Sequence, residues 1–373
     1  MKVNLLKDDL AAAVQAVARA ASGKNTVPIL GGIYLQASGD QLIFRATDLE
    51  IAMECVISAD VEAEGVTVVP GRIFNDMVRC LPAGDVTLTV EGGKMLVAYA
   101  ESELSLNCLD AEEFPLLPKG EGQISGAIDA RSFRRLVRQV SVAAASDESR
   151  PIFTGIFIRV ENGSVTMVAT DMHRLAVGKG DWQSEGSIEL IIPCRTMQEI
   201  ARLANDEEEL IQITASQNQA CFSFANITMT SRVIAGQYPD YRQVLPEPQL
   251  YVTNTLVNKA AMMAALERAV LLGRDMNRGR GNIVKLEWLA HKLVMTSSAT
   301  DVGRNVEQIP ASLTGEELAA NYNSRYLLEA LKVIDGERVS FHLTGANTPG
   351  VIVPEGEDTL IGSYIYLILP VRV

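Results

Sequence analysis

The sequence predicts an α+β protein that is built from three copies of one domain. The tripeptide Ala-Thr-Asp closes a β-rich run three times, at residues 46–48, 169–171 and 299–301. These copies stand about 120 to 130 residues apart, which is the length of an ordinary domain. Each is surrounded by the same order of elements: a helix, a polar loop, a strand group, a short helix and a second strand group. A chain of 373 residues is long enough for three such domains.

The first unit is expected to cover residues 1–120. Apolar residues at three- and four-residue spacing predict one helix over residues 8–21 and a shorter one over residues 72–81. Alternating and β-branched segments predict the strands, which are expected at residues 33–37, 42–47, 51–57 and 66–70 and within 86–109. Proline and glycine in residues 114–122 indicate a linker.

The second and third units, residues 121–248 and 249–373, are expected to repeat this order. Their helices are predicted at residues 130–145, 196–204, 259–272 and 324–334, the last with Asn323 or Ser324 as its N-cap. Their strands are predicted at residues 156–168, 188–193, 210–215, 219–224, 227–233, 283–298, 306–309, 339–343, 350–353 and 364–369. Residues 236–248 form a second proline-rich connector.

Composition places the chain among cytoplasmic proteins. It has no run of 18 apolar residues and no signal-peptide pattern at its N-terminus. Its five cysteines are scattered and never in C-x-x-C spacing, which argues for a reducing compartment and against a structural zinc site or a disulfide framework. The net charge of −13 argues against tight binding of nucleic acid through charge alone.

The positive charge is nevertheless concentrated on the predicted helices. Arg131, Arg134, Arg135 and Arg138 are spaced to share one face of the helix at residues 130–145. Further cations lie on or beside other helices: Arg19, Lys24, Arg72, Arg79, Arg195, Arg202, Arg325 and Lys332. If the helices face one axis, they form a positive lining inside an acidic shell, which suits loose contact with a phosphate backbone. The alternative is that each stripe is only a solvated basic face.

Motifs for chemistry are mostly missing from the sequence. It contains no phosphate-binding loop, dinucleotide fingerprint, nucleophile elbow or H-E-x-x-H metal motif. His173, His291 and His342 are far apart in sequence, so a metal site built from them is not favoured. Asp171 near His173 could support acid–base chemistry, but a polar pair at a strand end explains them better. We therefore expect no catalysis, metal or cofactor.

The C-terminal segment, residues 364–373, is almost wholly apolar. A buried last strand explains part of this composition. Because Pro370 cannot continue a central ladder, residues 371–373 are expected to leave the sheet. An apolar tail at the surface is typical of the wall of a groove for a partner peptide.

Four segments together resemble one family, the bacterial DNA polymerase III beta subunit, which is the replicative sliding clamp. They are Asn-Thr-Val-Pro-Ile-Leu at residues 25–30, Ala-Thr-Asp-Met-His-Arg-Leu-Ala at 169–176, Tyr-Pro-Asp-Tyr-Arg-Gln-Val-Leu-Pro at 238–246 and Leu-Pro-Val-Arg at 369–372. The resemblance covers the whole chain. It implies a ring-shaped head-to-tail homodimer of three-domain DNA-clamp protomers, with helices lining the inside and antiparallel sheets outside.

The resemblance also implies functional positions. Contacts with duplex DNA would involve Lys24, Arg72, Arg195 and Arg202. A peptide groove between the second and third units would bind the polymerase III catalytic subunit, the clamp loader, other polymerases and repair proteins. Its residues would be Phe153, Thr170, Met172, His173, Arg174, Leu175, Pro239, Val244, Asn323, Tyr326, Leu367, Leu369, Pro370, Val371 and Arg372. Leu271 and Leu272 are our candidates for the dimer interface.

One position departs from the family pattern. The family usually has glycine where Met172 stands, and Phe153 replaces a commoner aliphatic residue. A bulky thioether could narrow or reshape the groove and alter partner affinity. A variant clamp with changed partners or inhibitor binding is therefore the second hypothesis. An unrelated enzyme is the third, and the absence of a nucleophile or metal motif opposes it.

Overall fold

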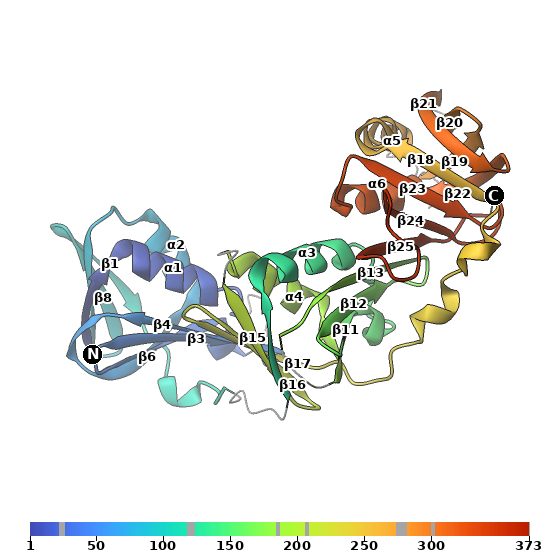
Figure 1. The fold of residues 1–373 in the computed structure, drawn as a ribbon. Coiled ribbons are helices and arrows are strands. Elements are labelled where there is room, and N and C mark those ends of the chain that lie inside the picture. Colours follow the sequence, from blue (N-terminus) through green and yellow to red (C-terminus); the bar gives the residue numbers. More distant parts are fainter. Residues whose placement is uncertain are drawn as a thin grey trace. The chain divides into compact units, whose positions relative to one another are not determined.

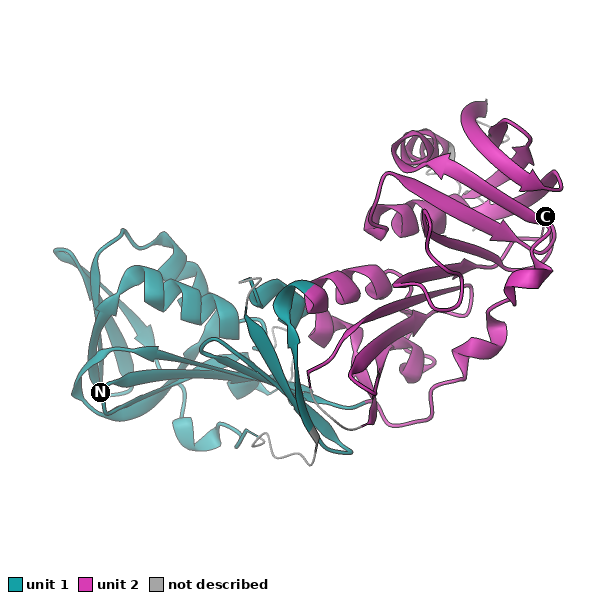
Figure 2. Cartoon of the chain, in the orientation of Figure 1, with its two compact units in different colours: residues 1–131, 199–233 teal, residues 132–198, 234–373 magenta. Residues whose placement is uncertain are grey.

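The structure is a computed structural model that describes residues 1–21, 27–117, 124–183, 187–205, 209–273, 282–299 and 303–372. The chain forms two compact units (Figure 2). Unit 1 contains residues 1–131 and 199–233, and unit 2 contains residues 132–198 and 234–373. All strand pairings between the described strands are antiparallel, and helices pack on the sheets, which is the α+β class that the sequence predicts.

Unit 1 holds two sheets (Figure 1). The first has the strand order β5 (Asp60–Ala63), β1 (Lys2–Leu6), β7 (Asp85–Glu91), β8 (Lys94–Tyr99) and β9 (Ser102–Asn107). The second has the order β10 (Ile124–Asp129), β15 (Leu210–Ala215), β16 (Gln219–Phe224), β17 (Ile227–Arg232), β4 (Ile51–Ser58), β3 (Gln41–Thr47), β2 (Gly32–Ser38) and β6 (Gly65–Pro70). Helices α1 (Lys7–Val17) and α2 (Gly71–Cys80) pack on each other, and α1 also packs on β3 and β4. Two short 3-10 helices, η1 (Pro28–Gly31) and η2 (Ala111–Glu113), complete the unit.

Unit 2 is organised around one long sheet. Its strand order is β14 (Ile188–Pro193), β11 (Gly155–Glu161), β12 (Ser164–Thr170), β13 (Arg174–Asp181), β25 (Tyr364–Ile368), β24 (Gly350–Pro354), β23 (Arg338–Leu343), β18 (Thr253–Asn258), β21 (Gly303–Gly315), β20 (Lys292–Ala299), β19 (Ile283–Leu289) and β22 (Leu318–Asn323). Helices α5 (Lys259–Gly273) and α6 (Ser324–Val333) pack on each other, and α5 covers β20 and β21. The 3-10 helices are η3 (Pro151–Thr154), η4 (Tyr241–Val244) and η5 (Pro248–Leu250).

The remaining helices, α3 (Ala130–Ser141) and α4 (Cys194–Leu203), each contribute residues to both units. None of the helices in the described ranges is long and apolar enough to span a membrane.

The sheets continue across the boundaries between the repeats. In unit 1, β4 of the first repeat pairs with β17 of the second, with Met53 opposite Met229. In unit 2, β13 of the second repeat pairs with β25 of the third, with Leu175 opposite Leu367. The second repeat therefore divides its strands between two sheets. For this reason the compact units do not coincide with the sequence repeats.

Each predicted helix is present, but some end early and some strands were missed. Helix α1 ends at Val17 rather than residue 21, and α3 ends at Ser141 rather than residue 145. A strand precedes the first helix of every repeat, and we did not predict any of these three: β1, β10 and β18. Strand β1 is short and buries only Val3 and Leu5. Strand β18 alternates, but two of its three buried residues are the threonines Thr253 and Thr255, so its sequence shows little hydrophobic periodicity.

Candidate protein-interaction site

The chain makes a tight turn between β12 and β13. The Thr170 hydroxyl accepts a hydrogen bond from the Met172 amide at 3.0 Å and donates to the Arg174 carbonyl at 2.6 Å. The Asp171 carboxylate accepts from the amides of His173 and Arg174 at 2.9 and 3.0 Å. Thr170 and Asp171 therefore supply the partners that this turn's backbone lacks, which is the usual role of such side chains.

The same turn occurs in the first repeat. Thr47 donates to the Ile51 carbonyl at 2.8 Å and accepts from the Leu49 amide at 3.0 Å, while Asp48 accepts from the amides of Glu50 and Ile51. The shared Thr-Asp pair is thus a structural signature of the repeat. The third copy, residues 300–301, lies outside the described residues.

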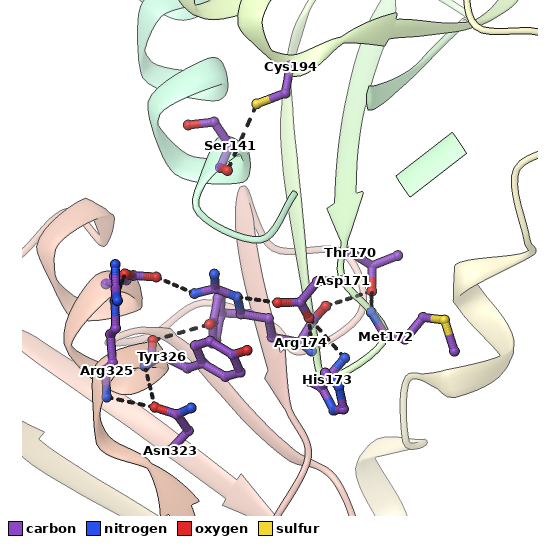
Figure 3. Close-up of polar contacts among 12 residues, drawn as sticks. Ser141, Thr170, Asp171, Met172, His173, Arg174, Cys194, Asn323, Arg325 and Tyr326 are labelled. Atoms are coloured by element: carbon purple, nitrogen blue, oxygen red, sulfur yellow. Dashed lines mark hydrogen bonds and ion pairs between the residues drawn. The ribbon is translucent and has the colours of Figure 1, made fainter. Parts of the chain in front are cut away.

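The turn forces its third residue into the left-handed backbone region. Met172 has φ of +72° and Leu49, at the corresponding place, has φ of +75°. This region costs an L-residue roughly 1–2 kcal/mol, and glycine enters it without that cost. Met172 is 48% exposed, its sulfur contacts the Arg150 guanidinium, and its side chain points away from Arg174 (Figure 3).

Arg174 anchors the turn to the third repeat. Its guanidinium is buried, forms ion pairs with Asp171 at 3.0 Å and Glu329 at 2.5 Å, and lies 4.0 Å from the centre of the Tyr326 ring (Figure 3). Burial alone would lower the pKa of Arg174, but Tyr366, Glu329 and Asp171 together raise it above its usual value. Arg174 is therefore a fixed cation that joins β13 to α6.

Asn323 orients the start of α6. Its side-chain oxygen accepts hydrogen bonds from the amides of Arg325 at 3.0 Å and Tyr326 at 3.4 Å. This confirms the predicted cap and explains how Tyr326 reaches the Arg174 guanidinium. The Tyr366 hydroxyl also donates to the Tyr326 carbonyl at 3.2 Å, which ties α6 to β25.

An apolar cluster lies beside the turn. Phe153, Leu175 and Leu367 are buried in it, and Tyr238 stacks on Phe157 with 4.9 Å between ring centres. The members of this cluster come from β11, β12, β13, β14, β24, β25, η3 and the connector after residue 233. The structure thus brings segments that are far apart in sequence into one patch.

The tail leaves the sheet where the sequence predicts. Strand β25 ends at Ile368, the Leu369 amide donates to the His173 carbonyl at 2.9 Å, and the Val371 amide donates to the Asn321 carbonyl at 2.8 Å. Leu369 is exposed, as are Pro239, Val244, His173 and Arg372. Pro370 and Val371 are half-buried, and residue 373 lies outside the described range.

The expected groove residues therefore fall into two groups. One group is buried and supports the surface: Phe153, Arg174, Leu175 and Leu367. The other offers atoms to solvent: Thr170, Met172, His173, Pro239, Val244, Asn323, Tyr326, Leu369, Pro370, Val371 and Arg372. Asp171 serves the backbone and Arg174, which assigns it a structural contact rather than a part in acid–base chemistry.

Two partners of Arg174 were missed. Glu329 stands 155 positions away in the chain, and Tyr366 lies on β25, so no local pattern could pair them with Arg174. The apolar tail was the available signal, because a buried last strand was expected to explain part of its composition. Every residue of β25 is indeed buried.

The helix cations have different surroundings. Arg72, Arg79, Arg131, Arg138, Arg195 and Arg202 are exposed, and Arg134 and Arg135 are half-buried. Arg138 pairs with Asp335 at 2.7 Å, Arg202 pairs with Glu199 at 3.2 Å, and Arg135 donates to the Lys179 carbonyl at 3.3 Å. Lys24 lies outside the described residues. These contacts reduce the charge that Arg138 and Arg202 can offer to a polyanion.

Other expectations concern the third repeat. Leu271 near the end of α5 is 58% exposed, and the side chain of Leu272 lies outside the described part of the chain. In the described ranges, no group of three or more His, Cys, Asp or Glu side chains is placed to hold a metal ion.

Three family models match the chain in succession. They are described as the N-terminal, central and C-terminal domains of the DNA polymerase III beta subunit, and they match residues 1–118, 127–240 and 242–372.

Named relatives match over the full length. The chain is 34% identical to the beta sliding clamp of Bacillus subtilis over 385 residues, covering 100% of both chains. It is 31% identical to that of Staphylococcus epidermidis over 381 residues, covering 99% of this chain and 97% of the relative.

Solved structures match in the same way. The sliding clamp of Bacillus subtilis superposes with a TM-score of 0.93 at 33% identity, covering 100% of this chain and 99% of that one. A sliding clamp of Pseudomonas aeruginosa bound to griselimycin gives a TM-score of 0.93 at 27% identity, covering 100% of both chains.

Proposed function

This chain belongs to the DNA polymerase III beta subunit family, the bacterial beta sliding clamps, and we propose that two copies close head to tail around duplex DNA. The protein is a DNA polymerase processivity factor and a non-catalytic polymerase subunit. The full-length match to the Bacillus subtilis clamp is the observation that carries this conclusion. In the proposed ring, six similar domains place helices inside and sheets outside.

We propose domain boundaries at residues 1–120, 121–248 and 249–373. The recurrence of the Thr-Asp turn in the first two repeats supports this division. Backbone pairing of β4 with β17 and of β13 with β25 joins neighbouring repeats within each unit. A ring that must hold its shape while it slides needs such junctions.

The proposed DNA-facing cations are Lys24, Arg72, Arg79, Arg131, Arg134, Arg135, Arg138, Arg195 and Arg202. A closed ring stays on DNA by topology, so it needs only weak, salt-sensitive contacts with phosphates. The net charge of −13 and the ion pairs of Arg138 and Arg202 support weak rather than tight contact. We expect no base-specific contacts from this arrangement.

The proposed partner groove is the exposed surface around the β12–β13 turn, the connector at residues 238–246 and the tail. It combines buried apolar support with exposed anchors, which fits a short linear peptide. We propose that the polymerase III catalytic subunit, the clamp loader, other polymerases and repair proteins compete for it in the bacterial cytoplasm. Support comes from the cluster that joins Phe153, Leu175 and Leu367.

Retention on circular DNA tests the ring. The protein, loaded on a nicked plasmid by its clamp loader, is expected to stay bound through gel filtration and to be lost after the plasmid is linearised. Blocking both ends of the linear DNA with bound protein should restore retention. Equal retention on circular and open linear DNA would contradict topological tethering.

A second candidate function is a clamp with altered partner or inhibitor affinity. The left-handed backbone at Met172 favours this candidate, because a methionine there accepts strain that glycine would avoid. The variant keeps the same fold and the same ring, and differs in which peptides it binds best.

A further inference from the structure

A cavity of about 890 Å³ lies in unit 2 next to the proposed partner groove. Its walls come from β11, β12, β13, the connector segment that contains η4 and η5, and residues 360–361. Val244 belongs to this wall and is also one of the proposed groove residues. The groove and the cavity are therefore neighbours along one surface.

Strand alternation places the cavity on the same sheet face as the apolar cluster. Leu175, Val177 and Lys179 alternate along β13 and so point to one face. Leu175 and Val177 belong to the cluster, whereas Val177 and Lys179 line the cavity. Strand β11 also runs from the cluster to the cavity, since Phe157 belongs to the cluster and Arg159 lines the cavity.

The distance between the two regions matches a few residues of peptide. Lys179 lies four positions after Leu175 in β13, which corresponds to about 13 Å at roughly 3.3 Å per residue. An extended peptide that is anchored above Leu175 reaches Lys179 after about four of its own residues. A partner segment slightly longer than the anchor motif therefore reaches the cavity.

Two of the three cations that line the cavity are not held in an ion pair by any described residue, although carboxylates line it too. Arg159 is paired with Glu161 at 3.5 Å and Glu189 at 3.2 Å. Lys179 and Arg242 form no ion pair with a carboxylate in the described ranges of the chain; Lys179 donates to the Leu360 carbonyl at 3.0 Å. Burial and the nearby Arg242 lower the pKa of Lys179, and Asp358 partly opposes this shift.

Carboxylates stand near both of these cations: Asp358 acts electrostatically on Lys179, and Asp240 and Glu161 act on Arg242. The Asp358 carboxylate accepts hydrogen bonds from the amides of Leu360 and Ile361 at 2.7 and 2.9 Å. Glu247 lines the cavity wall and accepts a hydrogen bond from the Gln249 amide group. Lys179 and Arg242 can therefore each offer a direct ion pair to an acidic ligand group, since no carboxylate in the described ranges takes that place.

We propose that this cavity extends the partner groove and binds an acidic side chain that lies about four residues from the apolar anchors of a partner peptide. The inference rests on the proposed groove. It goes beyond the groove because it predicts that the partner peptide carries an acidic residue near its apolar anchors. Lys179 and Arg242 would contact the acidic group, and Val244 and Leu245 would guide the peptide between the two regions.

Short fluorescein-labelled peptides test this assignment by fluorescence anisotropy. All carry the same Leu-Ala-Leu-Phe anchor, and a spacer places an Asp-Asp or an Asn-Asn pair at one end or the other. We expect Asp-Asp at one end to bind about fivefold more tightly than Asn-Asn at that end, as for one favourable charge contact near a surface. The gain should shrink at about 0.5 M NaCl, because salt screens exposed charges.

Charge variants of the protein show which residues cause the preference for Asp-Asp. For each variant, the measured quantity is the ratio of the affinity for the Asp-Asp peptide to the affinity for the Asn-Asn peptide. Arg242 is exposed, so Arg242→Gln should fold normally and reduce the ratio by at least about twofold. Glu247→Gln should increase the ratio. Lys292→Gln removes an exposed cation of β20, outside the cavity, and should leave the ratio unchanged.

The outcomes separate this proposal from the groove itself. If the Asn-Asn peptides bind and Asp-Asp adds nothing at either end, the cavity assignment is wrong and the groove stands. A gain that persists unchanged in Arg242→Gln also overturns it. If none of the peptides binds, the groove proposal fails together with this one.

Discussion

Met172 has a backbone conformation that favours glycine and a side chain that adds apolar surface to the proposed groove. Its φ of +72° favours glycine, whereas its exposed thioether adds a flexible apolar surface beside the groove. Sequence comparison with the family pattern identified the position, but only the structure shows the strained backbone. Leu49 has the same conformation in unit 1, where no groove is proposed. The two positions therefore form a matched pair.

Met172→Gly and Leu49→Gly should have similar effects on stability and different effects on binding. Each removes a left-handed L-residue, so each should change the free energy of unfolding by about 1 kcal/mol or less in the stabilising direction. Only Met172→Gly should change the affinity for a partner peptide taken from the polymerase III catalytic subunit of the same bacterium. Thermal unfolding and fluorescence anisotropy measure the two quantities. Indistinguishable peptide affinities for wild type and Met172→Gly would sink the variant hypothesis.

His342 gives the fold a dependence on pH. Its Nδ1 lies 2.7 Å from the Asn254 side-chain oxygen, which can only accept, so Nδ1 donates and Nε2 is the unprotonated nitrogen. Nε2 is buried without a hydrogen-bond partner, and burial lowers the pKa of His342, although Asp358 opposes this shift. Protonation of the ring would therefore place a charge in an unfavourable site.

The free energy of unfolding should fall as the pH is lowered below about 6.5. In that range the unfolded chain binds a proton at His342 that the folded chain does not, so acid favours unfolding. The slope from this residue is at most about 1.4 kcal/mol per pH unit. Urea unfolding across this range should show a smaller slope for His342→Gln, while His291→Gln, at an exposed position, keeps the wild-type slope. An unchanged slope in His342→Gln would contradict this origin.

At the scale of elements, the sequence predicted the helices and strands that have a clear hydrophobic periodicity. It missed short strands and contacts between residues far apart in the chain. Helices with an apolar stripe and strands that alternate were found, and Asn323 was recognised as a cap. The ends of α1 and α3 were placed too late because the alanine-rich segments after Val17 and Ser141 continue a helical pattern without a helical backbone. The missed strands β1 and β18 alternate in burial, but each is short and places few apolar side chains in that pattern.

The candidate site was predictable in part for the same reason. Residues 170–175 and the tail stand in continuous motifs, so they could be recognised without the fold. The ion pair of Arg174 with Glu329 joins two elements through the tertiary structure, and no periodicity encodes such a contact. The division of the second repeat between two sheets could not be predicted either, because the sequence pattern of a strand does not indicate which strand it pairs with.

The cations on α2 should contribute to DNA binding through charge alone. Arg72 and Arg79 are exposed, so the double variant Arg72→Gln/Arg79→Gln should fold normally and neutralise up to two fewer phosphates. The plot of log affinity against log salt for short duplex DNA should become shallower, by about 0.9 for each phosphate that is no longer neutralised. Arg338→Gln on β23 removes an exposed arginine that pairs with Glu355 and serves as the control. Equal slopes for the double variant and wild type would show that α2 does not face the DNA.

At the scale of the whole molecule, a ring needs an interface between one end of each protomer and the opposite end of its partner. The family implies that the first repeat of one chain meets the third repeat of the other. Leu271 supports the placement of this contact at the end of α5, because a large apolar side chain with 58% of its surface exposed favours burial by a partner. Burying such a side chain contributes about 1.5–3 kcal/mol.

Replacing Leu271 and Leu272 by aspartate should therefore convert the dimer to monomers, because each partner surface would have to bury charge without a counter-ion. Native mass spectrometry should give twice the chain mass for wild type and the single chain mass for the variant, with unchanged circular dichroism. Leu116→Asp changes a leucine that is 99% exposed and should remain dimeric. The monomeric variant should also lose retention on circular DNA, because an open protomer cannot encircle it. A dimer that persists in Leu271→Asp/Leu272→Asp would place the interface on another part of the third repeat.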